Sequence, residues 1–160
     1  MCIITIEELY NEASHFRKAI ETAKDEGEFK PKPYKAERMN GFPIDCCDDT
    51  SDLFAHYLFS KFKLVTERVD GSYYNNELNC TCYHSWLLVN NLIVDLTGDQ
   101  FDSSSSLKIK APKVYVGYID DFHRQFEEVR NVKSCGIDSL GSGCHERMYG
   151  LYSAIMNYMS

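Results

Sequence analysis

The sequence predicts an α+β fold, and three observations lead to this prediction. The chain has 160 residues, of which 44% are hydrophobic and 13% aromatic, so it can bury a sizeable core. Two segments with helical spacing come first, several short β-rich segments follow, and helical spacing returns at the end. This order differs from alternating βα units and favours helices packed on an antiparallel sheet. We therefore expect residues 1–160 to form a single domain.

The first helix is expected over residues 5–26. Thr5 and Glu8 have the spacing of a capping box, apolar residues recur at helical intervals after them, and Gly27 is a natural stop. The next segment, residues 28–45, contains Pro31, Pro33 and Pro43 and is predicted to be an extended connector.

A second helix is expected over residues 47–62. Its apolar residues fall on one face, and Asp48 and Asp49 lie in the first turn, where the helix dipole favours acidic groups.

The β-rich part begins with a strand over residues 63–70 and a loop over residues 71–79. Residues 81–89 and 92–97 are predicted to form a hairpin, because Asn90 and Asn91 tolerate the positive φ of a tight turn. The remaining expectations are short strands at 107–109 and 114–118, a helix over 120–130, and a last helix capped by Ser142.

The charge and the N-terminus limit the partners and the location of the protein. The formal net charge is −7, and nucleic acids and acidic membranes bind basic surfaces, so we expect neither as a partner. Residues 1–8 lack the pattern of a secretory signal, and no apolar run approaches the ~18 residues of a membrane span. We expect a cytoplasmic protein, or one exported without a recognisable N-terminal signal peptide. The odd number of cysteines, seven, favours free thiols, metal ligands or a nucleophile over disulfides.

Cys46 and Cys47 lie where the connector meets the second helix. A helix N-terminus stabilises a thiolate, and its free N–H groups can hold an oxyanion. Asp48 and Asp49 oppose this, because a nearby negative charge disfavours the thiolate, so we expect them to face away. The alternative is that both cysteines are small buried hydrophobes.

His84 and Asp95 are the candidate base and its orienting acid. Alternate residues of a strand share a face, so His84 shares one with Cys80, Cys82 and Trp86. Pairing Val89 with Leu92 across the turn puts Asp95 diagonally opposite His84, where the carboxylate can accept the Nδ1 proton. The alternative for His84 alone is a hydrogen-bonded core residue. A carboxylate inside an apolar strand, however, needs a partner.

These three segments resemble a known superfamily. Cys47 opening an apolar helix, His84-Ser85-Trp86, and Asp95-Leu96-Thr97 together resemble the transglutaminase-like branch of the papain-like cysteine enzymes, over roughly residues 41–101. The run from Asp95 to Phe101 resembles a subset of bacterial proteins of unassigned role. The resemblance aligns Cys47 with the nucleophile, His84 with the base and Asp95 with the orienting acid. Cys46 stands where the family usually has glycine.

The resemblance implies a nucleophile helix packed on an antiparallel β-sheet, and thiol-dependent acyl transfer on carboxamide or peptide bonds. A protein glutamine deamidase or a cysteine protease is the expected activity, with a protein or peptide substrate and no cofactor; transamidation is a further option. The Cys47 backbone N–H is the expected oxyanion donor, with Asn40 and Gln100 as side-chain candidates.

Two other interpretations remain open. One is a catalytically inactive binding domain with the same fold. The other is a zinc-binding module, in which Cys80, Cys82 and His84 are joined by Cys46-Cys47 or by Cys144-His145, although their spacing is unlike that of known zinc motifs.

Overall fold

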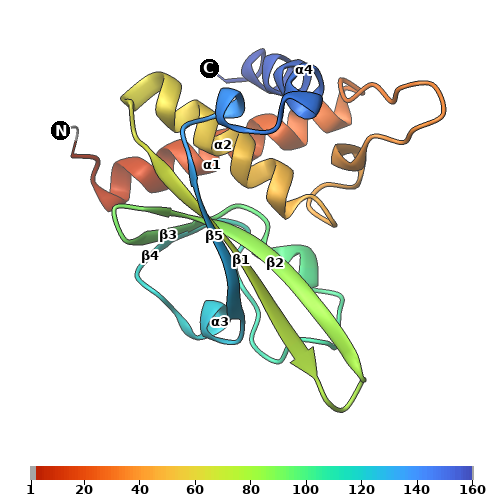
Figure 1. The fold of residues 1–160 in the computed structure, drawn as a ribbon, viewed down its shortest axis with the longest axis vertical. Coiled ribbons are helices and arrows are strands. Elements are labelled where there is room, and N and C mark those ends of the chain that lie inside the picture. Colours follow the sequence, from red (N-terminus) through yellow and green to blue (C-terminus); the bar gives the residue numbers. More distant parts are fainter. Residues whose placement is uncertain (1–2, 160) are drawn as a thin grey trace.

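Residues 3–159, the part of the chain that the computed structural model describes, contain four α-helices and a five-stranded antiparallel sheet (Figure 1). The sheet order is β4-β3-β2-β1-β5, and the predicted α+β class is confirmed. The helices are α1 (Ile6–Asp25), α2 (Cys47–Phe62), α3 (Asp121–Arg124) and α4 (His145–Met156). The strands are β1 (Thr66–Asn75), β2 (Cys80–Val89), β3 (Leu92–Asp95), β4 (Tyr115–Gly117) and β5 (Glu127–Ser134).

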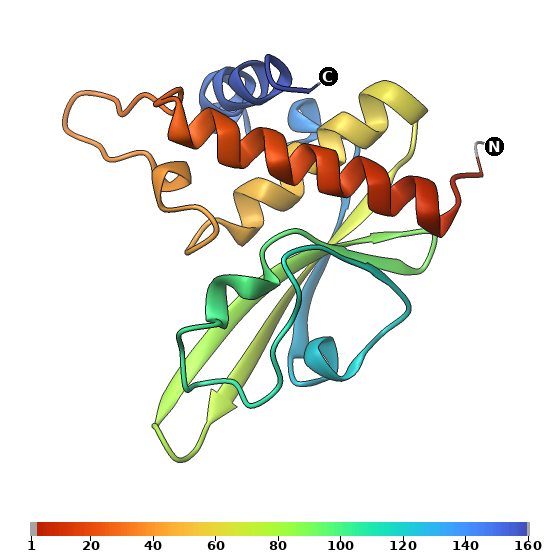
Figure 2. The same cartoon turned by 180° about the vertical axis from the view of Figure 1, so that it is seen from behind.

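The sheet separates two hydrophobic clusters. Helices α1, α2 and α4 lie together on one side of it, and α3 lies on the other (Figures 1 and 2). The larger cluster joins these three helices to one face of the hairpin, including Leu87, Val89 and Val94. The smaller cluster covers the opposite face with Trp86, Phe101, Leu107, Phe122 and Phe126. The alternation of side chains along β2 therefore directs neighbouring residues into different clusters.

The two long helices agree closely with the sequence. At the start of α1, the Glu8 N–H donates to Thr5 Oγ1 (3.1 Å) and the Thr5 N–H donates to Glu8 Oε2 (2.8 Å), so the capping box is confirmed. Helix α2 begins at Cys47 as predicted and ends where Lys63 takes a left-handed conformation (φ 57°).

The β2–β3 hairpin has the predicted two-residue turn. Asn90 and Asn91 have positive φ angles of 51° and 65°, and Val89 pairs with Leu92. Strand β3 ends at Asp95, two residues earlier than expected. Helix α4 also forms, although Ser142 lies in a separate 3₁₀ turn before it and is not its N-cap.

Three local predictions were wrong. Residues 120–130 do not form one helix: α3 ends at Arg124 and the chain continues into β5. Residues 71–79 are not all loop, because β1 runs on to Asn75. No strand is assigned to residues 107–109. In β5, pairing with β1 outweighs the local helical spacing that the sequence shows after Asp120. Strand formation depends on the neighbouring strand more than on intrinsic propensity.

Gly71 shows why β1 was hard to recognise. The register of β1 against β5 shifts between Asp70 and Gly71, and a glycine inside a strand often marks such a bulge. A Cβ at Gly71 would lie 2.8 Å from the Cβ of Phe126, so only glycine lets that side chain pack against the strand.

Within residues 3–159, none of the helices combines the length and the apolar character that crossing a lipid bilayer would demand.

Candidate active site

Cys47 is the first residue of α2, and the backbone before it needs no glycine. Cys46, the N-cap residue, has φ −134° and makes no side-chain capping bond. The left-handed conformation falls instead on Asp45, with φ 57°. The N–H groups of the first turn are thus left without a side-chain cap, which is the arrangement that binds an anionic oxygen.

The two adjacent cysteines have different surroundings. Cys46 is fully buried, and burial raises the pKa of its thiol to about 12. Cys47 is only partly buried and lines a cavity of about 400 Å³ together with His84 and Gln100. Cys46 is therefore a buried hydrophobic residue, and Cys47 is the thiol that a ligand in this cavity can reach.

His84 and Asp95 form a buried hydrogen bond. His84 Nε2 lies 2.6 Å from Asp95 Oδ2, and both side chains are at most 1% exposed. The second carboxylate oxygen of Asp95 accepts the N–H of Thr97 at 2.9 Å. The bond uses Nε2 and not Nδ1, which corrects the expectation from sequence. Nδ1 lies instead 2.9 Å from the Gln100 side-chain amide.

The pKa values of this pair shift in opposite directions. Burial acts to lower the pKa of His84, but the Asp95 carboxylate outweighs it, with a smaller contribution from Cys47, and the result is about 9. Burial acts to raise the pKa of Asp95, but His84 and His123 bring it well below its usual range. The His84 ring also lies among aromatic rings that exclude water, those of Trp86, Phe101, Phe122 and Phe126.

The acidic residues after Cys47 are matched by arginines. Asp49 is 6% exposed, and its carboxylate accepts hydrogen bonds from Arg147 of α4 (2.7 and 3.2 Å) and from Arg38 (3.0 Å). Asp48 does not face away from the site as expected, since it lines the cavity with Arg38, 3.6 Å away. The charge of Asp49 is therefore compensated by two arginines.

Several other sequence-based candidates lie elsewhere. The Asn40 side chain donates to the Phe29 carbonyl (2.9 Å) and does not line the cavity, whereas Gln100 does. The proposed zinc ligands do not gather: among the described residues, the one group with metal-ligand proximity is His84, Asp95 and His123. Its separations of 2.6 and 2.9 Å are hydrogen-bond lengths, shorter than the roughly 3.3 Å between neighbouring ligands of a tetrahedral zinc ion.

His123 is the site residue that sequence reasoning missed. It is 1% exposed, and its Nε2 lies 2.9 Å from the same Asp95 oxygen that His84 contacts. Its only local signal is Asp120 three residues earlier, which caps α3. Nothing in the sequence indicates that this turn meets the end of β3.

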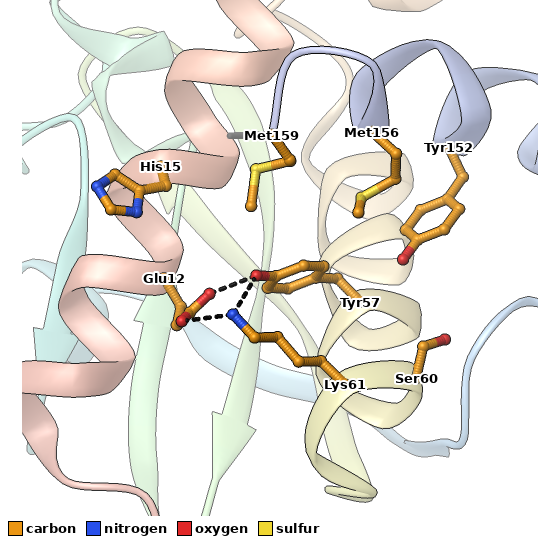
Figure 3. A pocket seen from close by; sticks show the side chains of 8 residues that line it. All are labelled: Glu12, His15, Tyr57, Ser60, Lys61, Tyr152, Met156 and Met159. Atoms are coloured by element: carbon orange, nitrogen blue, oxygen red, sulfur yellow. Dashed lines mark hydrogen bonds and ion pairs between the residues drawn. The ribbon is translucent and has the colours of Figure 1, made fainter.

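A second cavity, of about 430 Å³, lies between α1, α2 and α4 (Figure 3). Its lining contains no thiol. Three of its polar groups pair with one another, since Lys61 Nζ lies 2.9 Å from Glu12 Oε1 and the Tyr57 hydroxyl donates to the same carboxylate. The cavity that contains Cys47 and His84 is therefore the candidate active site.

Comparison with known proteins found no matching family model, no similar curated protein and no similar solved structure. The function is therefore argued from the geometry of the site.

Proposed function

We propose that the chain is a thiol-dependent acyl-transfer enzyme with a transglutaminase-like, papain-like fold, and that it hydrolyses carboxamide or peptide bonds. Cys47 is the nucleophile, His84 is the general base and then the general acid, and Asp95 orients His84. A protein glutamine deamidase or a cysteine protease fits this assignment.

The buried bond between His84 and Asp95 carries the proposal. Burying a carboxylate and an imidazole at 2.6 Å fixes the ring orientation and favours the imidazolium, as in other thiol and serine nucleophile systems. The ring nitrogen that remains, Nδ1, is the one close to the Gln100 amide, and Gln100 lines the cavity with Cys47. Cys47 and His84 Nδ1 thus border one cavity, as a thiol and its base require.

The chemistry follows from this orientation. Because Asp95 raises the pKa of His84, the proton of the Cys47 thiol passes to His84 Nδ1 and leaves a thiolate beside an imidazolium, while Nε2–H continues to donate to Asp95. The thiolate sulfur attacks the substrate carbonyl carbon, the C–S bond forms, and the carbonyl π electrons move to oxygen. When the tetrahedral intermediate collapses, the C–N bond breaks and His84 Nδ1–H protonates the departing ammonia or amine. Water, deprotonated by His84, then cleaves the thioester and restores Cys47.

Two donors suit the developing oxyanion. The Cys47 backbone N–H lies at the uncapped N-terminus of α2, where the helix dipole adds to its effect. The Gln100 side chain lines the same cavity, and the amide N–H that is not directed at His84 Nδ1 is the one left for the oxyanion. The amide of Gln100 can also turn its oxygen toward the ring, so it can bond to either protonation state of His84.

Thiol alkylation tests the assignment. Iodoacetamide, a reactive amide, is reacted at neutral pH with the wild type and with Cys47→Ala, Cys46→Ala and His84→Ala, and the modified residue is located by mass spectrometry. We expect rapid modification of Cys47 in the wild type and in Cys46→Ala, none at this site in Cys47→Ala, and slow modification in His84→Ala. Cys144, partly buried and far from His84 in sequence, is the internal reference for ordinary thiol reactivity.

Turnover is then measured as ammonia released from glutaminyl peptides and as cleavage of a peptide library. If Cys47 reacts no faster than Cys144, the enzyme assignment is wrong and an inactive binding domain is the better description. If Cys46→Ala alone abolishes the rapid reaction, the nucleophile is Cys46.

A further inference from the structure

Asp95 contacts two histidines, and the second has no role in the proposed chemistry. One carboxylate oxygen, Oδ2, lies 2.6 Å from His84 Nε2 and 2.9 Å from His123 Nε2. All three side chains are at most 1% exposed. A carboxylate oxygen can accept two hydrogen bonds, so Asp95 is satisfied by both rings and by the Thr97 N–H.

The other nitrogen of His123 also faces a carboxylate. Nδ1 lies 2.5 Å from Asp120 Oδ1, which accepts the His123 backbone N–H as well (3.0 Å). Ionised carboxylates only accept hydrogen bonds, so both ring nitrogens of His123 must donate. An imidazole ring donates from both nitrogens only when it is protonated. The Asp120 side chain is 25% exposed, so this row of groups connects the buried Asp95 to the surface.

We propose that His123, held by Asp120, is a protonated positioning residue that fixes Asp95 and offsets part of its charge where it acts on His84. The inference rests on the proposed function for its catalytic consequence, but the structural relationship can be tested without a substrate.

Charge balance supports this inference. Before the Cys47 proton reaches His84, this row of groups contains the two carboxylates Asp95 and Asp120 and the single imidazolium of His123. When Cys47 transfers its proton, His84 becomes the second imidazolium. The ring centroids of the two histidines are 6.3 Å apart, so the charge on His123 disfavours protonation of His84. His123 thus weakens the stabilisation of the His84 imidazolium by Asp95. His84 can therefore give its proton to the leaving group.

The other ionisable groups around this row do not replace His123. On its β4 side the ring packs against Tyr115 (centroids 5.4 Å apart), whose pKa is raised by burial and by Asp120. On the cavity side, His84 faces Cys47 of α2. The remaining charged groups of that cavity are Asp45, Asp48 and Asp70 with Arg38 and Arg68.

The test is an NMR titration of the His84 ring in protein labelled at histidine. The variants are His123→Gln, Asp120→Asn and Asp95→Asn, with Asp121→Asn as the matched control, because Asp121 is adjacent, 79% exposed and paired with Arg124. Signals are assigned with His84→Gln. We expect the His84 midpoint to rise by roughly one to two pH units in His123→Gln, the scale for a unit charge at this separation. It should rise less in Asp120→Asn, fall in Asp95→Asn and stay unchanged in Asp121→Asn.

The His84 midpoint should shift in opposite directions in His123→Gln and Asp95→Asn. This difference distinguishes a charged positioning residue from a residue that only packs. If the midpoint is unchanged or lower in both His123→Gln and Asp120→Asn, the inference is wrong. Asp120→Asn decides the question alone if His123→Gln does not fold, because the Asp120 side chain is partly exposed.

Cys47 alkylation in the same samples distinguishes the two proposals. Rapid alkylation of the wild type with no movement of the His84 midpoint would reject the role of His123 and leave the enzyme assignment in place. A midpoint that moves as expected in a protein whose Cys47 is unreactive would reject the enzyme assignment alone.

Discussion

Arg147 in the last helix binds Asp49 in the first turn of the nucleophile helix through two hydrogen bonds, of 2.7 and 3.2 Å, across 98 residues of sequence. The same guanidinium also donates to both carboxylate oxygens of Glu37 in the connector. The hydrogen bonds to Asp49, and to a smaller extent those to Glu37, raise the pKa of Arg147 above its ordinary value, although burial acts to lower it. Three separate segments are thus joined beside Cys47.

Replacing Arg147 by Met is expected to destabilise the protein by about 2–4 kcal/mol, because two largely buried carboxylates lose their shared partner. Urea denaturation measures this. Iodoacetamide should also react more slowly with Cys47, since Asp49 would then disfavour the thiolate. Arg130→Met, on the exposed strand β5, is the control and should change stability by less than about 0.5 kcal/mol. Equal effects of the two substitutions would contradict a special role for Arg147.

The pH dependence of stability should report His84. Its folded-state pKa of about 9 lies above the ordinary value of 6.5. The group therefore contributes stability that is fully present below pH 6.5 and is lost as the pH rises through 9. We expect the free energy of unfolding to decline between pH 7 and 9.5 more steeply in the wild type than in His84→Gln. Parallel curves for the two proteins would show that the His84 ring does not gain protons on folding.

Gln100 should affect turnover far more than alkylation of Cys47. If its amide donates to the oxyanion, Gln100→Ala should lower kcat by roughly 100-fold once a substrate is known. Alkylation by iodoacetamide forms no oxyanion, so its rate should fall much less than kcat and reflect only the loss of the amide beside His84 Nδ1. Asn40→Ala is the matched control, because the Asn40 amide is bonded to the Phe29 carbonyl outside the cavity. A comparable loss of kcat in Asn40→Ala would remove Gln100 from the proposed oxyanion site.

Gly98 is expected to tolerate no side chain. A Cβ there would lie 2.6 Å from the Ala111 Cβ and 3.1 Å from Asp95 Oδ2. Gly98→Ala should cost about 1–3 kcal/mol and slow the alkylation of Cys47 by displacing Asp95. Gly150→Ala, in α4 with no neighbouring atom within 4 Å, should instead gain up to about 1 kcal/mol from helix propensity. The midpoint of thermal or urea unfolding should therefore fall in Gly98→Ala and rise in Gly150→Ala.

The sequence predicts those parts of the site that depend on local geometry. The start of α2 at Cys47 follows from helical spacing, and the proximity of Asp95 to His84 follows from a two-residue turn and strand alternation. His123 and Arg147 could not be predicted in the same way. They meet Asp95 and Asp49 across 28 and 98 residues, and only the packing of α3 and α4 brings them there.

The choice of nitrogen on His84 was also beyond the sequence. Which ring atom meets Asp95 depends on how the ring rotates among Phe101, Phe122 and Phe126. Two of these phenylalanines come from the segment 120–130, which the sequence wrongly assigned to a single helix. The wrong assignment of residues 120–130 therefore concealed both the aromatic surroundings of His84 and its neighbour His123.

The turn at Asn90 and Asn91 limits which changes of length the chain can accept. Val89 pairs with Leu92 directly across it, so inserting or deleting one residue there would shift β3 by one position against β2. Because neighbouring strand residues point to opposite faces, Asp95 would then exchange places with a hydrophobic neighbour and leave His84 without its carboxylate. Insertions in the exposed connector around Tyr34 have no such effect on register. Variation in chain length is therefore expected to accumulate in the connector and to be excluded from the hairpin turn.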